Sequence, residues 1–474
     1  MKLLKVFPVF LLLGLARLDA SVNALKSVSE DQTAVEVTVY NSNLGLVKDT
    51  RRIKLLKGVG ELRFMDVAAS IMPVTVTVRS LTHKNDFSVL EQNYEYDLMS
   101  DKKLLDKYVG KKIKIIDWNK FKDRKEKVNA LLLSNNRGQI YRIDDEIYLG
   151  HPGYKVLPEI PENLISKPTL MWLYENSVED AHEIEVSYLT GGISWKADYI
   201  VKLNKDDTFA DISGWVTLDN KSGAAYKDAK LKLVAGKVNR AEGGQMYNKK
   251  RMPGLMSADK GGSGFEEKVF FEYHIYDLQR KTTIKNNQTK QISLLSADSV
   301  GVKKEFIVYG ARGYFTRMQR GGGKKQPVGV FVKFKNTEKN NLGMPLPGGI
   351  MRMYKKDPDS SLQFVGEDRV GHTPKDEEIK LKIGEAFDVI AERTQTDYRR
   401  ITSSLHESEW EIALRNHKEE EIEVSLVEPL YGNWKVISKS HPYKKVDAFT
   451  VRFNVKVPKG GVVKVRYRVR VGLE

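Results

Sequence analysis

Cysteine is absent from the whole sequence of 474 residues. Without cysteine the chain can form neither a disulfide framework nor a lipid-modified N-terminal cysteine. If such a protein is exported, a bacterial periplasm or the extracellular space suits it better than a eukaryotic secretory route. The absence therefore bounds the compartment and leaves the molecular function open.

Long apolar runs and catalytic motifs are also missing. After the first 24 residues, no run approaches the length of about 18 apolar residues that a membrane-spanning helix needs. There is no GxSxG serine elbow, no HExxH zinc motif, no calcium loop and no phosphate loop, and the eight histidines are scattered. The sequence therefore offers no catalytic residue, no metal site and no cofactor. Paired carboxylates of a glycosidase leave no spacing rule, so a carbohydrate-active or metal-dependent hydrolase stays open as the alternative.

The first 24 residues have the features of a secretory signal. Lys2 and Lys5 supply a positive start, residues 6–16 are apolar, and Ala24 and Ala20 are candidate cleavage positions among small residues. We therefore expect residues 1–24 to be a signal peptide and the protein to be periplasmic or secreted in a bacterium.

Composition otherwise describes a globular protein with a basic surface. Hydrophobic residues make up 41% and charged residues 30% of the chain, and the formal net charge is +16. A positive balance of this size favours anionic partners and surfaces without selecting one.

Apolar and polar residues alternate through most of the chain, which predicts a mainly β protein. In residues 182–236, four such runs follow one another with turn-like separators such as Gly191-Gly192. Successive side chains leave a strand on opposite faces, so this pattern is typical of half-buried antiparallel strands. The spacing favours several antiparallel β-sandwich modules.

Four modules are expected after the signal peptide. They are an N-terminal β module over residues 25–96, a small module over 97–160, a central β-sandwich over 161–310 and a C-terminal β-sandwich over 311–474. Within the central module, residues 237–268 lack periodicity and are rich in Gly, Met and Lys, which predicts a mobile loop.

The small module combines one short helix with closely spaced strands. Ser100 is a good N-cap and Gly110 stands where a helix would stop. Five short strand candidates follow between residues 112 and 157. This density favours a small SH3- or OB-like barrel segment inserted near the N-terminus.

Several longer strings carry a family resemblance. They include YNSNLGLVKDTR, YLTGGISWKADY, NLGMPLPGGIMRMYKKD and LRNHKEEEIEVSLVEPLYGNW. The chain resembles bacterial secreted proteins of the mucoidy-inhibitor-like family over almost all of its length after the signal. The resemblance implies an exported protein with a β-sandwich C-terminal region of unknown function. Many relatives have a helical coiled-coil hairpin where this chain has residues 97–160, so a role tied to that hairpin does not carry over.

Two basic features suggest anion binding. The last strand places Lys464, Arg466, Arg468 and Arg470 on one face, unless a run such as Glu419, Glu421 and Glu423 neutralises them across the sheet. The second feature is a loop whose cations Arg312, Arg317, Arg320, Lys324 and Lys325 are interleaved with Tyr314 and Phe315. If the loop does not simply serve solubility, we expect an anionic envelope polysaccharide, lipid headgroups or another envelope protein as the partner in an exported protein, and no nucleic acid.

Aromatic and acidic residues supply two weaker candidates. Trp195 and Tyr199 lie on the apolar face of their strand and are expected in the core. Trp215 faces the other way and could form a partner surface or cover a second layer of the core. The segment GEDRVGHTPKDEE around His372 could bind a metal, but a solvated turn is favoured. The sequence thus predicts an exported cell-envelope protein that acts as a non-catalytic binding or scaffold protein.

Overall fold

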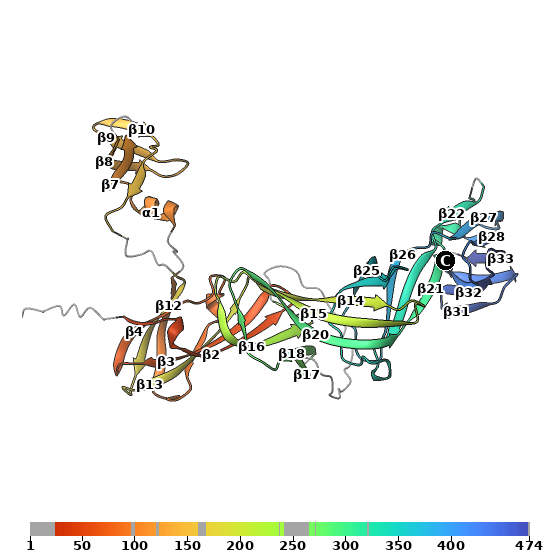
Figure 1. Cartoon of the computed structure of the whole chain (residues 1–474), viewed down its shortest axis with the longest axis horizontal. Coiled ribbons are helices and arrows are strands. Elements are labelled where there is room, and N and C mark those ends of the chain that lie inside the picture. The colour runs from red at the N-terminus through yellow and green to blue at the C-terminus, as the bar shows by residue number, and fades with distance from the viewer. Residues whose placement is uncertain are drawn as a thin grey trace, which may run out of the picture. The chain divides into compact units, whose positions relative to one another are not determined.

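The computed structural model describes residues 24–95, 100–119, 123–159, 167–236, 238–240, 265–270, 272–319 and 322–472. Strands dominate these residues, which confirms the mainly β fold (Figure 1). The chain divides into two compact units that are interleaved in sequence. Unit 1 includes Leu46–Gly191 and Ser222–Tyr226, and unit 2 includes Val37–Gly45, Gly192–Lys221 and the chain from Lys227 onward. Each unit holds more than one sheet, so this division does not test the four predicted modules.

Unit 1 contains two sheets that pack face to face. The ring of Phe87 on one sheet lies 6.2 Å from that of His182 on the other. The first sheet has the order β1-β4-β12-β6. Its strands are β1 (Leu25–Ser27), β4 (Gly58–Met65), β12 (Thr169–Asn176) and β6 (Phe87–Glu95). In the second sheet, β13 (Ala181–Thr190) pairs with β5 (Thr77–Ser80). Two further strands, β2 (Gln32–Tyr40) and β3 (Leu44–Lys54), cross the boundary between the units in the sequence.

The small module follows its predicted elements closely. The helix α1 (Asp101–Lys107) begins after Ser100, whose hydroxyl accepts from the Lys103 amide, and Gly110 has a positive φ of 82° beyond its end. The sheet has the order β10-β9-β8-β7-β11. Its strands are β7 (Lys112–Asn119), β8 (Arg124–Ser134), β9 (Ile140–Ile143), β10 (Glu146–Leu149) and β11 (Tyr154–Val156).

This sheet is open, which corrects the expected barrel. Its edge strands β10 and β11 are short and, within the described part of the module, do not pair with each other. Closure of a barrel needs paired edges, so these short strands leave a single sheet covered on one face by α1. Leu105 and Tyr108 of the helix segment pack with Ile113, Ile115 and other buried residues of the sheet.

In unit 2, a five-stranded sheet has the order β20-β15-β14-β24-β25. Its strands are β20 (Gln288–Gly301), β15 (Phe209–Asn220), β14 (Ile193–Leu203), β24 (Gly349–Lys356) and β25 (Leu362–Val370). Trp195 and Tyr199 are buried, as predicted, and the Trp195 ring lies 6.1 Å from that of Tyr276 on β18 (Tyr273–Leu278). The indole nitrogen of Trp195 donates to the carbonyl of Val234 on β16 (Tyr226–Ala235). The pairing of β14 with β24 is parallel, so the sheet is mixed rather than purely antiparallel.

Unit 2 also contains a sandwich of two sheets, which we call the C-terminal sandwich. The two sheets share one hydrophobic core, which includes Phe453, Trp410 and Tyr467. The first sheet contains β26 (Glu378–Glu385), β23 (Gly329–Lys335), β21 (Lys303–Tyr309), β29 (Ile422–Pro429), β32 (Thr450–Val457) and β31 (Tyr443–Asp447). The second contains β22 (Lys324–Gln326), β27 (Val389–Arg400), β28 (Leu405–Asn416), β33 (Val462–Gly472) and β30 (Asn433–Lys439).

Two predicted segments, the signal peptide and the loop, lie largely outside the described residues. Of the predicted signal peptide, residues 1–23 lie outside the described residues, as do residue 237 and residues 241–264 of the predicted loop. The end of that loop is corrected, because Phe265–Phe270 forms strand β17 and pairs with β18. In the described ranges, no helix has both the length and the apolar character needed to cross a bilayer.

Candidate functional site

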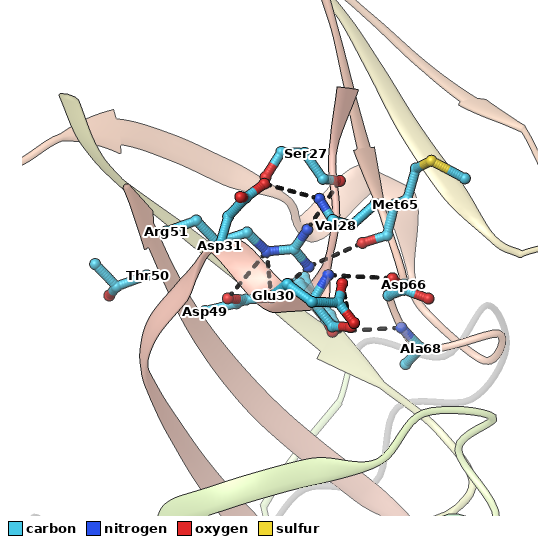
Figure 2. Close-up of polar contacts among 12 residues, drawn as sticks. Ser27, Val28, Glu30, Asp31, Asp49, Thr50, Arg51, Met65, Asp66 and Ala68 are labelled. Carbon is cyan, nitrogen blue, oxygen red and sulfur yellow. Dashed lines mark hydrogen bonds and ion pairs between the residues drawn. The ribbon is translucent and has the colours of Figure 1, made fainter. Parts of the chain in front are cut away.

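A buried arginine in unit 1 joins three strands. Arg51 on β3 is 1% exposed, and its guanidinium Nη2 lies 2.8 Å from Asp49 Oδ2. Nη1 donates to the Ser27 carbonyl at 3.1 Å and Nη2 donates to the Met65 carbonyl at 2.8 Å. The guanidinium carbon lies 3.5 Å from the centroid of the Phe64 ring. Figure 2 shows the polar contacts of Arg51 with Asp49, Ser27 and Met65, which lie on β3, β1 and β4. The cation is fully engaged by the protein, so the cluster holds strands together and presents no free charge.

A second buried cluster joins the two sheets of the C-terminal sandwich. Arg393 Nη2 on β27 donates to Glu428 Oε1 on β29 at 2.5 Å, and Nη1 donates to the Tyr467 hydroxyl on β33 at 3.1 Å. Burial raises the pKa of both Glu428 and Tyr467. All three side chains are buried in the core, so this cluster also has a structural role.

A serine and a histidine in unit 1 have part of the geometry of a catalytic triad. Ser80 Oγ lies 3.1 Å from His182 Nδ1, and both residues are buried. A triad needs an acid on the other nitrogen of the same histidine. Here Asp180 instead lies 3.5 Å from Nε2 of His83. Burial lowers the pKa of His182, and the serine hydroxyl also accepts from the His83 amide, so the pair supports packing rather than nucleophilic attack.

A polar cleft of about 490 Å³ in unit 2 could suggest a hydrolase. Its lining includes Asp207, which lies 2.7 Å from Lys304 and 2.5 Å from Lys355. Burial would raise the pKa of Asp207, but hydrogen bonds from both lysines lower it. A glycosidase acid needs a raised pKa, so Asp207 is unsuited to that role.

The cations of the last strand are paired, which corrects the prediction of a free anion-binding line. Lys464 and Arg466 lie 2.9 and 2.5 Å from Glu411. Arg468 lies 2.8 Å from Asp397, and Arg470 lies 2.8 Å from Glu407. These carboxylates come from β28 and β27, not from residues 419–423, because β28 is the hydrogen-bonded neighbour of β33. The pairing removes the basis for an anion site on this strand.

The basic loop is fixed by its aromatic residues. Phe315 is 1% exposed, and the ring of Tyr314 lies 5.5 Å from that of Trp410. The prediction that Phe315 forms part of an exposed aromatic surface is therefore wrong. The Arg312 guanidinium stacks 3.9 Å from the Tyr431 ring. Arg320 lies outside the described residues. The remaining predicted cations, Arg317, Lys324 and Lys325, are exposed.

The two weaker candidates from the sequence are Trp215 and the segment around His372. Trp215 is 37% exposed on β15 and faces away from the core. His372 Nδ1 accepts from the Gly348 amide at 3.1 Å, and burial lowers its pKa. Asp368 accepts from the Lys382 amide, and Glu367 pairs with Arg352. These acids therefore hold strands, and the part of the chain that the structure describes contains no group of three or more acidic or histidine side chains placed to hold a metal ion.

A further surface lies on the small module, opposite α1. Ile113 and Ile115 on β7 are buried against the helix, so the alternate side chains of that strand point to the other face. The strand register then places on this second face five exposed cations, Lys112, Lys114, Lys125, Lys127 and Arg142. We call this surface the basic face.

The basic face differs from the last strand in having no opposite charge. Across the described strands of the module, no carboxylate lies on this face. Asp117 and Glu126 are opposite each other in the strand register and point to the helix side. None of the five cations forms an ion pair with a described residue. Like-facing residues on one strand are roughly 6.8 Å apart and strands about 4.8 Å apart, so the cations form an array that extends across three strands, with Lys125 and Arg142 at its opposite ends.

Large apolar side chains are interleaved with these cations. Trp118 lies opposite Lys125, Ile147 lies opposite Arg142, and Val156 lies opposite Lys114. Tyr154 and Leu149 complete the set and are 83% and 85% exposed. Exposed apolar patches of this kind mark interaction surfaces in soluble proteins.

Sequence reasoning predicted the five strands but missed this face. The signal was present in the alternation of Lys112 with Lys114 and of Lys125 with Lys127, but the sequence does not say which strands are neighbours. No protein-family model matches the chain, and a search of curated proteins found no match. The resemblance to the mucoidy-inhibitor-like family therefore stays a prediction.

Proposed function

We propose that this is an exported protein of the cell envelope that binds an anionic partner without catalysis. The observation that supports the proposal is the basic face, where Lys112, Lys114, Lys125, Lys127 and Arg142 lie together with no carboxylate among the described residues of that face. Elsewhere, cations such as Arg466 and Arg468 are neutralised by their neighbours. The five unpaired cations are therefore gathered on one face of this sheet.

The hydrolase alternative has less support. The carboxylates that we traced are tied to cations or to backbone amides, and the pKa of Asp207 in the polar cleft is lowered rather than raised. A binding role needs only an accessible surface of complementary charge. Such a surface attracts an anionic partner over distances up to about the Debye length.

A pair of charge-matched variants tests the proposal. The first carries Lys112→Ser, Lys114→Ser and Lys127→Ser on the basic face, and the second carries Arg317→Ser, Lys324→Ser and Lys325→Ser on the basic loop. We expect the first variant to elute from a sulfated polysaccharide column at clearly lower salt than the parent, because it loses three unpaired cations of one array. The second should elute close to the parent, since Lys324 and Lys325 are consecutive on the short strand β22 and therefore point to opposite faces, whereas Arg317 lies in the preceding loop.

The opposite order of elution would transfer the anion site to the loop. Equal elution of both variants and the parent would contradict binding through either surface. Circular dichroism and thermal unfolding provide the control, because all six side chains are exposed and their loss should leave the fold unchanged.

A further inference from the structure

The apolar part of the basic face narrows the chemistry of its partner. Ile147, Leu149, Tyr154, Trp118 and Val156 are 62%, 85%, 83%, 51% and 39% exposed, respectively. Isolated apolar side chains on a surface need no explanation, but these lie on one face of a single small sheet. A partner that offered only charge would leave them in water.

The apolar residues and the cations have a definite arrangement. The sheet order β10-β9-β8-β7-β11 puts Ile147 and Leu149 on one edge strand and Tyr154 and Val156 on the opposite edge strand. The five cations occupy the three strands between these edges. Both edge strands thus carry exposed apolar residues on this face, and the three strands between them carry the cations together with Trp118.

We infer that the basic face docks on an anionic lipid surface, with the lysines and Arg142 at the headgroups and the exposed apolar residues entering the boundary with the acyl chains. This inference rests on the proposed function and names the partner of the same site. Interfacial binding depends on buried apolar area together with attraction to anionic lipids, and the face supplies both. Trp118 and Tyr154 suit the interface, because their rings are apolar and their ends are polar.

A linear polyanion fits the same face less well. Polysaccharides and single-stranded nucleic acids use flat aromatic rings, on which sugars or bases stack. Here two of the exposed apolar residues, Trp118 and Tyr154, have rings, but the other three, Ile147, Leu149 and Val156, have no flat face to offer. Lysine side chains can extend along an apolar surface and keep the ammonium group in water, so the cations and aliphatic residues are compatible at a membrane interface.

Vesicle co-sedimentation of the full chain tests the inference. The probes are vesicles of phosphatidylglycerol mixed with phosphatidylcholine, vesicles of phosphatidylcholine alone, and a soluble sulfated polysaccharide. We expect binding to the anionic vesicles at low salt and none to the neutral ones. The variant with Lys112→Ser, Lys114→Ser and Lys127→Ser should bind anionic vesicles roughly 100-fold more weakly, since each cation near such a surface contributes about a factor of five.

The decisive variant carries Ile147→Ser and Leu149→Ser and keeps every charge. It should lose at least about tenfold in vesicle affinity and retain its affinity for the soluble polysaccharide. A matched control carries Val74→Ser and Val462→Ser, which are 97% and 58% exposed on other parts of the chain. The control should bind vesicles like the parent.

The outcomes separate the two proposals. If the lysine variant loses both ligands and the apolar variant loses neither, the anion site stands and the lipid inference is overturned. Tighter binding to the soluble polysaccharide or to single-stranded nucleic acid than to anionic vesicles would also overturn it. If the lysine variant binds every probe as the parent does, the proposed function itself fails.

Discussion

Two buried arginines, Arg51 in unit 1 and Arg393 in unit 2, each pair with a carboxylate and lie near aromatic rings. The guanidinium group suits such places because its planar fork donates several hydrogen bonds in fixed directions and stacks on rings. Arg51 uses this geometry to reach two backbone carbonyls as well as Asp49. A lysine ammonium could not make the same set of contacts.

Replacement of Arg51 by methionine should strongly destabilise unit 1. Arg51→Met leaves Asp49 buried without its partner, and breaking a buried ion pair on one side lowers the free energy of unfolding by about 3–5 kcal/mol. The control is Arg79→Met, whose side chain is 68% exposed although it lies 2.7 Å from Glu185. An exposed pair of this kind contributes about 1 kcal/mol or less. Urea unfolding measures both values.

Equal losses for Arg51→Met and Arg79→Met would contradict the structural role of the buried cluster. The double variant Arg51→Met with Asp49→Leu provides a second check, because it removes both charges and should recover part of the loss.

Gly310 follows β21 and depends on close packing against β29. A Cβ at this position would lie 2.0 Å from Glu428 Oε2 and 3.2 Å from the Pro429 ring. That carboxylate is fixed by its hydrogen bond from Arg393, so it cannot easily move aside. The backbone at this position leaves no room for a side chain.

We therefore expect Gly310→Ala to lower the free energy of unfolding by about 1–3 kcal/mol, the usual range for overpacking a rigid site. Gly313→Ala is the control, since a Cβ there meets nothing within 4 Å. Thermal unfolding compares the two variants. A transition of Gly310→Ala at the same temperature as that of Gly313→Ala would show that the carboxylate yields, and would contradict a fixed cluster.

Single strands and helices could be predicted well from the sequence, whereas the pairing of strands within a sheet could not. The five strands and the helix of the small module follow from local alternation, Ser100 and Gly110, and the structure confirms them. Local patterns carry no record of which strands pair. For this reason the sequence suggests residues 419–423 as the acids that neutralise Arg466 and Arg468, and it does not reveal the basic face.

Burial of a loop residue is equally hard to predict. Tyr314 and Phe315 stand among cations and near glycines, which suggests a surface loop. The structure places Phe315 against Trp410, a residue that comes 95 positions later. Such long-range packing depends on the assembled sandwich and has no local signal.

At the scale of the whole molecule, the described fold starts close to the predicted cleavage positions. The strand β1 begins at Leu25, directly after Ala24, and pairs in parallel with β4. Cleavage after Ala24 or after Ala20 would leave β1 complete. The Ser27 carbonyl would then still accept from Arg51.

Mass spectrometry of the protein from its native host tests export. We expect the mature form to begin at Leu25 or at Ser21, because small residues precede both positions. Recovery of an intact form from Met1 in the cytosol would contradict the signal peptide. A cut beyond residue 27 would remove β1 and contradict its place in the fold.

The interleaving of the two units also constrains the order in which the newly made chain can fold. Unit 1 is incomplete until Tyr226 has been synthesised, and Val37–Gly45 of unit 2 is made before most of unit 1. Contacts between residues far apart in the sequence close slowly. A nascent chain of this design cannot complete unit 1 until nearly half of the chain has been made, which leaves its apolar strand faces accessible to chaperones during that time.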